Sequence, residues 1–154
     1  MVNREMIGKA LSTFTYEVDR SKIRELALAV GDPNPIYQDV AAARAAGYPD
    51  LPAPPTFGTV LSFWGNRRGF ITFRELNITQ PNLVLHGEEE YNYLAPIYAG
   101  DTITGTLTMT GVDEKQGRTG SLEFVTFEFD YINQNGAAVL KTRQTAVIRQ
   151  EVAK

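Results

Sequence analysis

One short run contains the residues whose types and spacing suggest chemistry most directly. Residues 31–37 have the sequence Gly-Asp-Pro-Asn-Pro-Ile-Tyr, so a carboxylate, a carboxamide and a phenol lie close together along the chain. The two prolines fix φ at their own positions and restrict the residues before them, which makes the run stiff. A carboxylate held in a rigid turn can orient water or accept a proton, so we interpret the run as a site that presents Asp32 and Asn34.

Three of the candidate residues also have plainer interpretations, which the sequence leaves open. Asp32 precedes a proline, where a carboxylate commonly accepts backbone N–H groups of its own turn. Tyr37 can orient a water molecule or a substrate, or its ring can be buried against the sheet. His86 is the single histidine and precedes Gly87 and three glutamates. It is either a proton-transfer group or a structural residue at a strand edge.

The run lies between two predicted helices. Apolar residues recur at helical spacing over residues 19–30, where Asp19 or Ser21 is the expected N-cap and Gly31 the expected stop. A shorter, alanine-rich helix is predicted over residues 39–46. The two helices are therefore expected to hold the run at both of its ends.

A third helix is predicted to begin near Thr56, after a proline-rich loop at residues 49–55. Phe63 and Phe70 lie off its main apolar stripe and leave room for another role, such as lining a ligand channel. Large residues share the stripe itself, which predicts the most buried helix of the chain: Phe57, Val60, Leu61 and Trp64.

The second half of the chain has the two-residue period of β-strands. The apolar phase slips between Phe124 and Phe127, which predicts a bulge or burial on both faces. The predicted helices are followed by about four long strands, and one short N-terminal strand is expected at 13–18. This order predicts an α+β fold in one domain spanning residues 1–154. The strand-like stretches include 102–110, 122–132 and 137–149, with hairpin loops expected at 111–120 and 133–136.

Bulk composition argues against several classes of protein. The chain has 154 residues, of which 43% are hydrophobic and 21% charged, and its net charge of -3 opposes nucleic-acid binding. Zero cysteines and one histidine argue against a thiolate or all-protein zinc site, so we predict no metal and no cofactor. The sequence shows no signal peptide and no apolar run of the ~18 residues that a membrane span needs, so we expect a cytoplasmic protein without a membrane partner.

Residues 31–37 resemble the hydratase motif of the MaoC-like family, the (R)-specific 2-enoyl-thioester hydratases and 3-hydroxyacyl-thioester dehydratases. That motif is Gly-Asp-x-Asn-Pro-aliphatic-His; six of its seven positions match here, and Tyr37 stands in place of the histidine. The similarity covers nearly the whole chain. Residues 84–101, with His-Gly-Glu at 86–88 and Ala-Gly-Asp at 99–101, are similar to dehydratase N-terminal-type domains. The resemblance implies a hot-dog fold, in which the sheet wraps around a long central helix, and pairing of two such domains with acyl-thioester sites at the interface.

The resemblance also implies roles for individual residues. Asp32 matches the aspartate that, with the histidine, holds the reacting water, and Asn34 matches the asparagine that shapes the loop. A phenol has a pKa near 10 and an imidazole one near 6.5, so proton transfer by Tyr37 at neutral pH is disfavoured by roughly 4–5 kcal/mol. The start of the central helix, where free N–H groups would receive the thioester oxyanion, corresponds to Thr56, Phe57 and Gly58.

The basic cluster of this acidic chain is formed by Arg67 and Arg68, with Arg74 beyond them. These side chains could contact the phosphates of coenzyme A or the acidic face of an acyl carrier protein. They could equally be the solvated end of a helix, where cations are favoured by the helix dipole.

Two functions of different class follow from the resemblance. In the first, the chain is a hydratase or dehydratase of 3-hydroxyacyl or 2-enoyl thioesters in fatty acid metabolism, acting as one subunit of a dimer. In the second, it is a non-catalytic acyl-binding subunit that shapes the fatty-chain tunnel for a catalytic hot-dog paralogue with an Asp/His pair. The replacement at Tyr37 favours the second function. A thioesterase of the same fold is a third option, but the chain shows no hydrolytic motif.

Overall fold

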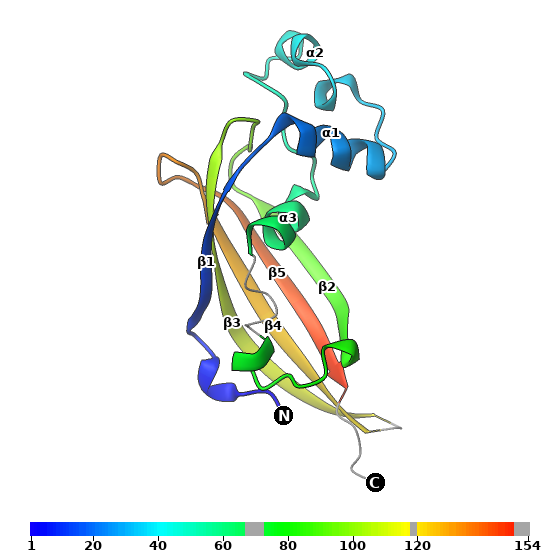
Figure 1. The fold of residues 1–154 in the computed structure, drawn as a ribbon, viewed down its shortest axis with the longest axis vertical. Helices are drawn as coiled ribbons and strands as arrows, with labels where there is room; N and C mark the ends of the chain where they lie inside the picture. Colours follow the sequence, from blue (N-terminus) through cyan, green and yellow to red (C-terminus); the bar gives the residue numbers. More distant parts are fainter. Residues whose placement is uncertain (67–72, 118–119, 150–154) are drawn as a thin grey trace.

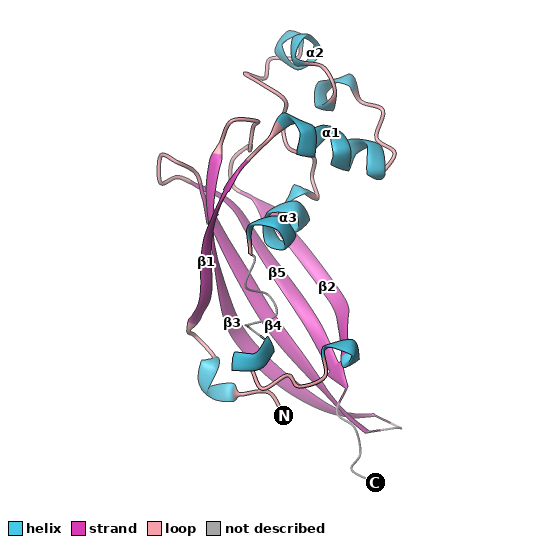
Figure 2. Ribbon diagram, in the orientation of Figure 1, coloured by secondary structure: helices cyan, strands magenta, loops and turns pink. Residues whose placement is uncertain are grey.

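A single antiparallel sheet forms the body of the molecule. The computed structural model describes residues 1–66, 73–117 and 120–149. Within them, five strands pair in the order β1-β3-β4-β5-β2, and helix α3 lies against one face of the curved sheet (Figures 1 and 2). The predicted arrangement of a helix on an antiparallel sheet is confirmed. The strands are β1 Ala10–Glu17, β2 Val84–Tyr93, β3 Thr102–Gly117, β4 Gly120–Ile132 and β5 Ala138–Arg149.

Two helices lie beyond one end of the sheet, at the opposite end from the N-terminus (Figure 1). The first, α1, spans Arg20–Ala29, and the second, α2, spans Val40–Ala45. The Asp19 carboxylate accepts the N–H of Ser21 and the Asp39 carboxylate accepts the N–H of Ala42, as N-cap residues do. The predicted starts of both helices are therefore confirmed, with Asp19 rather than Ser21 as the first cap. Short 3₁₀ turns occur at Arg4–Met6, Pro35–Tyr37 and Pro81–Leu83.

The central helix is shorter and less regular than expected. It begins as α3, Phe57–Val60, and continues as a π-helical turn, Leu61–Gly65. Phe57 and Leu61 are fully buried against the sheet, but Trp64 is 58% exposed and Phe63 is 74% exposed. The prediction that Trp64 belongs to the buried stripe was wrong, because the wider π turn breaks the 3.6-residue period and rotates the indole away from the sheet. The Lys22 ammonium instead lies 4.3 Å from the centre of the Trp64 ring.

The two central strands extend further than the sequence predicted. β3 continues to Gly117 and β4 begins at Gly120, so the expected loop at 111–120 is mostly strand. Three consecutive residues of β4, Val125 to Phe127, are buried, which confirms burial on both faces. The register shift lies in the partner strand, where Thr110 is the extra residue between Met109 and Gly111.

Candidate functional site

The run at residues 31–37 closes helix α1 and builds its turn from its own groups. Gly31 has φ +74°, a left-handed conformation that glycine adopts without strain. The N–H of Gly31 donates to the carbonyl of Leu28 at 3.1 Å, and the N–H of Asp32 donates to the carbonyl of Ala27 at 2.8 Å. These two bonds satisfy the last carbonyls of the helix in a Schellman motif.

Two side chains of the run then fix the backbone that follows. Oδ1 of Asp32 accepts the N–H of Asn34 at 2.9 Å, and Oδ1 of Asn34 accepts the N–H of Ile36 at 3.2 Å. Pro35 begins the 3₁₀ turn at its first position, where a missing N–H costs nothing. The structure thus places Asp32 and Asn34 in shaping the turn; a further contact with water or substrate stays a prediction.

Tyr37 ends the run with a half-buried phenol. Burial raises the pKa of Tyr37 above its ordinary value, and the Asp32 carboxylate and Tyr48 add to the increase. The hydroxyl therefore keeps its proton at neutral pH. It can donate or accept a hydrogen bond, but it is a poor base.

A pocket of about 420 Å³ opens beside Tyr37. Its walls come from Ile36 and Tyr37 of the run, from Tyr48 and residues 52, 53 and 55 of the loop before α3, and from Tyr93 with residues 94–96. The lining is apolar except for three tyrosine hydroxyls, and Asp32 is not part of it. The lining includes no carboxylate, imidazole, amine or guanidinium side chain. The pocket suits an apolar ligand rather than proton-transfer chemistry.

The start of the central helix, at Thr56, Phe57 and Gly58, meets a tyrosine of the sheet. The Tyr93 hydroxyl donates a 2.8 Å hydrogen bond to the carbonyl of Pro55. Burial raises the pKa of Tyr93 to about 12, whereas the backbone N–H groups of Gly58 and Phe57 near the phenol oxygen act to lower that pKa. The amides proposed for the oxyanion therefore face the Tyr93 oxygen, and the N–H of Phe57 also donates to Pro54 at 2.9 Å.

Gly58 is a close-contact position. A Cβ there would lie 2.8 Å from Cε1 of Tyr91 and 3.1 Å from Cδ2 of Leu140. The absence of a side chain at Gly58 therefore lets α3 approach β2 and β5. Gly58, which we predicted as a site residue, therefore has at least this packing role.

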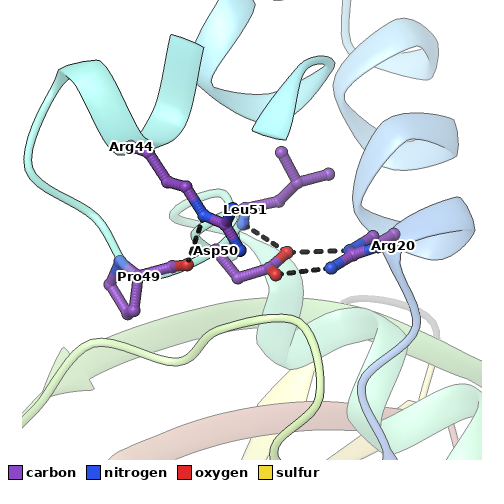
Figure 3. Close-up of polar contacts among 5 residues, drawn as sticks. All are labelled: Arg20, Arg44, Pro49, Asp50 and Leu51. Atoms are coloured by element: carbon purple, nitrogen blue, oxygen red, sulfur yellow. Dashed lines mark hydrogen bonds and ion pairs between the residues drawn. The ribbon is translucent and has the colours of Figure 1, made fainter. Parts of the chain in front are cut away.

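An ion pair anchors the loop that supplies one wall of the pocket (Figure 3). The Arg20 guanidinium, at the start of α1, donates to both carboxylate oxygens of Asp50, at 2.9 and 2.6 Å. Asp50 also accepts the N–H of Leu51, and Arg44 donates to the carbonyl of Pro49 (Figure 3). The bond from Arg20 holds the pKa of Asp50 at about 2, well below its ordinary value. Leu51 itself is fully buried, so the proline-rich loop is tightly fitted.

Two other candidates lie apart from this pocket. His86 is seven residues from Tyr93 along β2, roughly 23 Å at the usual rise of a strand. One ring nitrogen of His86 is 2.8 Å from the Gln144 amide nitrogen and the other is 3.7 Å from the Glu89 carboxylate. Arg67 and Arg68 lie outside the described residues. Within the described part of the chain, no cluster of three metal-binding side chains and no helix long enough to cross a membrane is found.

Sequence reasoning missed Tyr93 and Tyr48 as pocket residues. A signal for Tyr93 was present, since Tyr91 and Tyr93 alternate at the end of a strand that breaks at Leu94 and Pro96. Tyr48 follows a helix-ending glycine and precedes a proline, a pattern that locates a loop but not its partner.

Comparison with known proteins identifies the family of this chain. Residues 5–142 match the family described as FAS1-like, dehydratase domain region. A UPF0336 protein of Thermobifida fusca is 38% identical over 149 residues, covering 96% of this chain and 94% of the relative.

Solved structures show the same fold. A MaoC-like dehydratase superposes with a TM-score of 0.76 and 28% identity, over 93% of this chain and 43% of that one. The HadBC 3R-hydroxyacyl-ACP dehydratase complex of Mycobacterium tuberculosis gives a TM-score of 0.74 and 24% identity, over 88% of this chain and 94% of that one. The chain therefore belongs to the FAS1-like dehydratase region family and has the hot-dog fold of the MaoC-like dehydratases.

Proposed function

We propose that this chain is the acyl-binding subunit of a two-chain dehydratase that acts on 3-hydroxyacyl or 2-enoyl thioesters. A second hot-dog chain with an Asp/His pair would add or remove the water. The observation that carries the proposal is the pocket beside the motif, whose lining is apolar and tyrosine-rich and includes no carboxylate, imidazole, amine or guanidinium side chain.

The missing base is the chemical argument for a non-catalytic role. Reversible hydration needs a group that exchanges a proton near neutral pH and donors for the thioester oxyanion. Tyr37 occupies the position of the motif histidine and has a raised pKa. At the helix start, the Tyr93 oxygen lies near the Gly58 amide, and the N–H of Phe57 donates to the carbonyl of Pro54, so the amides proposed for an oxyanion have neighbours of their own. The proton-transfer group and the oxyanion donors that hydration needs are therefore both poorly provided in this site.

The pocket supports the binding part of the proposal. A volume of about 420 Å³ lies within the range of small-ligand sites, and its proline, alanine and leucine walls favour a hydrocarbon chain. The hydroxyls of Tyr37, Tyr48 and Tyr93 can give the thioester end a few directed hydrogen bonds. Coenzyme A and an acyl carrier protein both fit as the thiol carrier, with Arg67 and Arg68 as proposed contacts and the cytoplasm as the proposed location.

The two-chain part is supported by a similar protein. HadBC is a complex of a 3R-hydroxyacyl-ACP dehydratase. A similar arrangement here, a heterodimer with a catalytic paralogue, would supply the group that Tyr37 replaces. The alternative is that this chain is itself active in a homodimer, with Asp32 placing the water. The intact turn at residues 31–36 favours this alternative.

Hydration of crotonyl-CoA by the purified chain distinguishes these functions. We expect no turnover above the buffer rate, and a measurable rate when Tyr37→His restores the motif. Wild-type turnover that disappears in Asp32→Asn would refute the proposal and establish the chain as an enzyme.

Binding is tested separately by calorimetry with a saturated acyl-CoA. Ala53→Phe, which places a ring in the pocket, should weaken binding at least tenfold. Ala45→Phe, on the exposed side of α2, is the matched control and should leave the affinity unchanged. Equal affinity in the two variants would show that the acyl chain binds elsewhere.

A further inference from the structure

β2 is an edge strand with one side open for pairing. Within the described residues it pairs with β5 on one side only, as the last strand of the sheet. It contains no proline, and Leu85 near its start is 62% exposed. An open edge of this length can accept the strand of another chain through backbone hydrogen bonds.

The middle of β2 carries three consecutive glutamates. Glu88 and Glu90 are exposed, and they lie opposite Thr145 and Arg143 of β5. Glu89 lies beside Gln144 and near His86, on the other face of the strand. The Glu89 side chain is mostly covered, so a strand that docks on β2 meets two exposed carboxylates, Glu88 and Glu90, on one face of the sheet.

A second copy of this chain is a poor partner for such an edge. Two identical strands related by a two-fold axis must pair antiparallel, and a residue at the axis then faces its own copy. Pairing centred on Glu89 places Glu89 opposite Glu89 of the second copy, and Glu88 opposite Glu90 of that copy on each side of the axis. The exposed like-charge pairs are the two between Glu88 and Glu90, and each weakens association by roughly two- to fivefold, so together they weaken it by about four- to 25-fold.

We propose that β2 selects a different hot-dog subunit, one whose edge strand presents lysine or arginine opposite Glu88 and Glu90. This inference rests on the proposed function and adds the surface and the charge of the partner. The acidic run rejects self-pairing and attracts a basic strand, so both effects favour a heteromeric pair.

The position of the edge also connects the partner to the pocket. β2 ends at Tyr93, and residues 93–96 line the pocket beside the motif. Leu94 is 56% exposed at this point. A strand paired along β2 would therefore lead to the mouth of the pocket, where a second chain could supply the proton-transfer group that Tyr37 does not.

A charge-reversed copy of the chain tests the inference without knowledge of the natural partner. The double variant Glu88→Lys/Glu90→Lys keeps the fold and edge but reverses the exposed charges. Sedimentation velocity at low salt should show the wild type alone and the variant alone as weakly associating species. Their equimolar mixture should dimerise at an at least tenfold lower concentration, and high salt should remove this difference.

Glu5→Lys/Glu17→Lys is the matched control, since both glutamates are exposed and lie outside β2. A mixture of wild type with this control should associate no better than the wild type alone. If the charge-reversed mixture associates no better than the control mixture, or the wild type forms a tight homodimer that Glu88→Lys/Glu90→Lys leaves unchanged, the inference is overturned. This readout involves no catalysis, so it is independent of the crotonyl-CoA assay that tests the proposed function.

Discussion

The Tyr93 hydroxyl donates a hydrogen bond to the carbonyl of Pro55, and this 2.8 Å contact joins the end of β2 to the segment that enters the central helix. The same oxygen lies near the backbone N–H groups of Phe57 and Gly58. A side chain of the sheet therefore contacts the helix start beside the amides that we propose for a substrate oxyanion.

Removing this hydroxyl should cost stability. Tyr93→Phe leaves the Pro55 carbonyl without its donor, and we expect a loss of about 1 kcal/mol in the free energy of unfolding, measured with urea. In the Tyr37→His background, the same change should increase crotonyl-CoA hydration, because it removes the hydroxyl oxygen beside the Gly58 amide, whereas the N–H of Phe57 still donates to the carbonyl of Pro54. An unchanged or lower rate there would show that the Tyr93 hydroxyl does not compete with the oxyanion.

The two faces of the central helix should differ sharply in their sensitivity to truncation. Leu61→Ala removes a fully buried side chain and should destabilise the protein by about 2–5 kcal/mol. Phe63→Ala, two residues along the same turn and 74% exposed, should change stability by less than about 0.5 kcal/mol. Urea unfolding of the two variants checks the prediction, and a comparable loss in both would mean that the Phe63 ring is covered in solution.

Gly31 should tolerate asparagine better than alanine. Its φ of +74° is unfavourable for a residue with a Cβ, so Gly31→Ala should destabilise the fold by about 1–2 kcal/mol. Gly31→Asn should lose less, because asparagine adopts this conformation more readily. Thermal unfolding of both variants measures the difference, and equal midpoints would contradict the assigned role of the glycine.

Acid should weaken the anchor of the proline-rich loop. The folded pKa of Asp50, about 2, is below the ordinary value of 3.8, so the carboxylate contributes stability above about pH 4. That contribution is lost as the pH falls from about 4 towards 2, where the folded protein also takes up the proton. Asp50→Asn should flatten this part of the stability profile in urea titrations. Asp113→Asn, on an exposed position of β3, should leave it unchanged.

Local signals in the sequence predicted much of the fold. Asp19 and Asp39 cap helices where expected, because a short acidic side chain satisfies the first free N–H groups without any tertiary partner. The hairpin at 133–136 forms for a similar reason. Oδ1 of Asn133 accepts two backbone N–H groups, and Gly136 has φ +75°.

Features that depend on distant parts of the chain could not be predicted in this way. Trp64 occupies a buried position of an ideal helix, and only the π turn, formed in the folded packing, moves it outward. Tyr93 meets Pro55 from a separate element 38 residues along the chain. Sequence periodicity places each element but does not report which faces meet, so the candidate loop was found and the pocket wall was not.

The turn at residues 31–37 explains how the shape of a hydratase signature can persist when the histidine at its end is replaced. Gly31 ends a helix, Asp32 and Asn34 bond the backbone beside them, and Pro35 starts the next turn. Such a segment keeps its shape when the final side chain changes, because Tyr37 contributes only its backbone N–H, which donates to the carbonyl of Asn34. The signature thus combines a structural pattern with a chemical one. Relatives that retain only the structural pattern should be sorted by the side chain at position 37 before an activity is assigned to them.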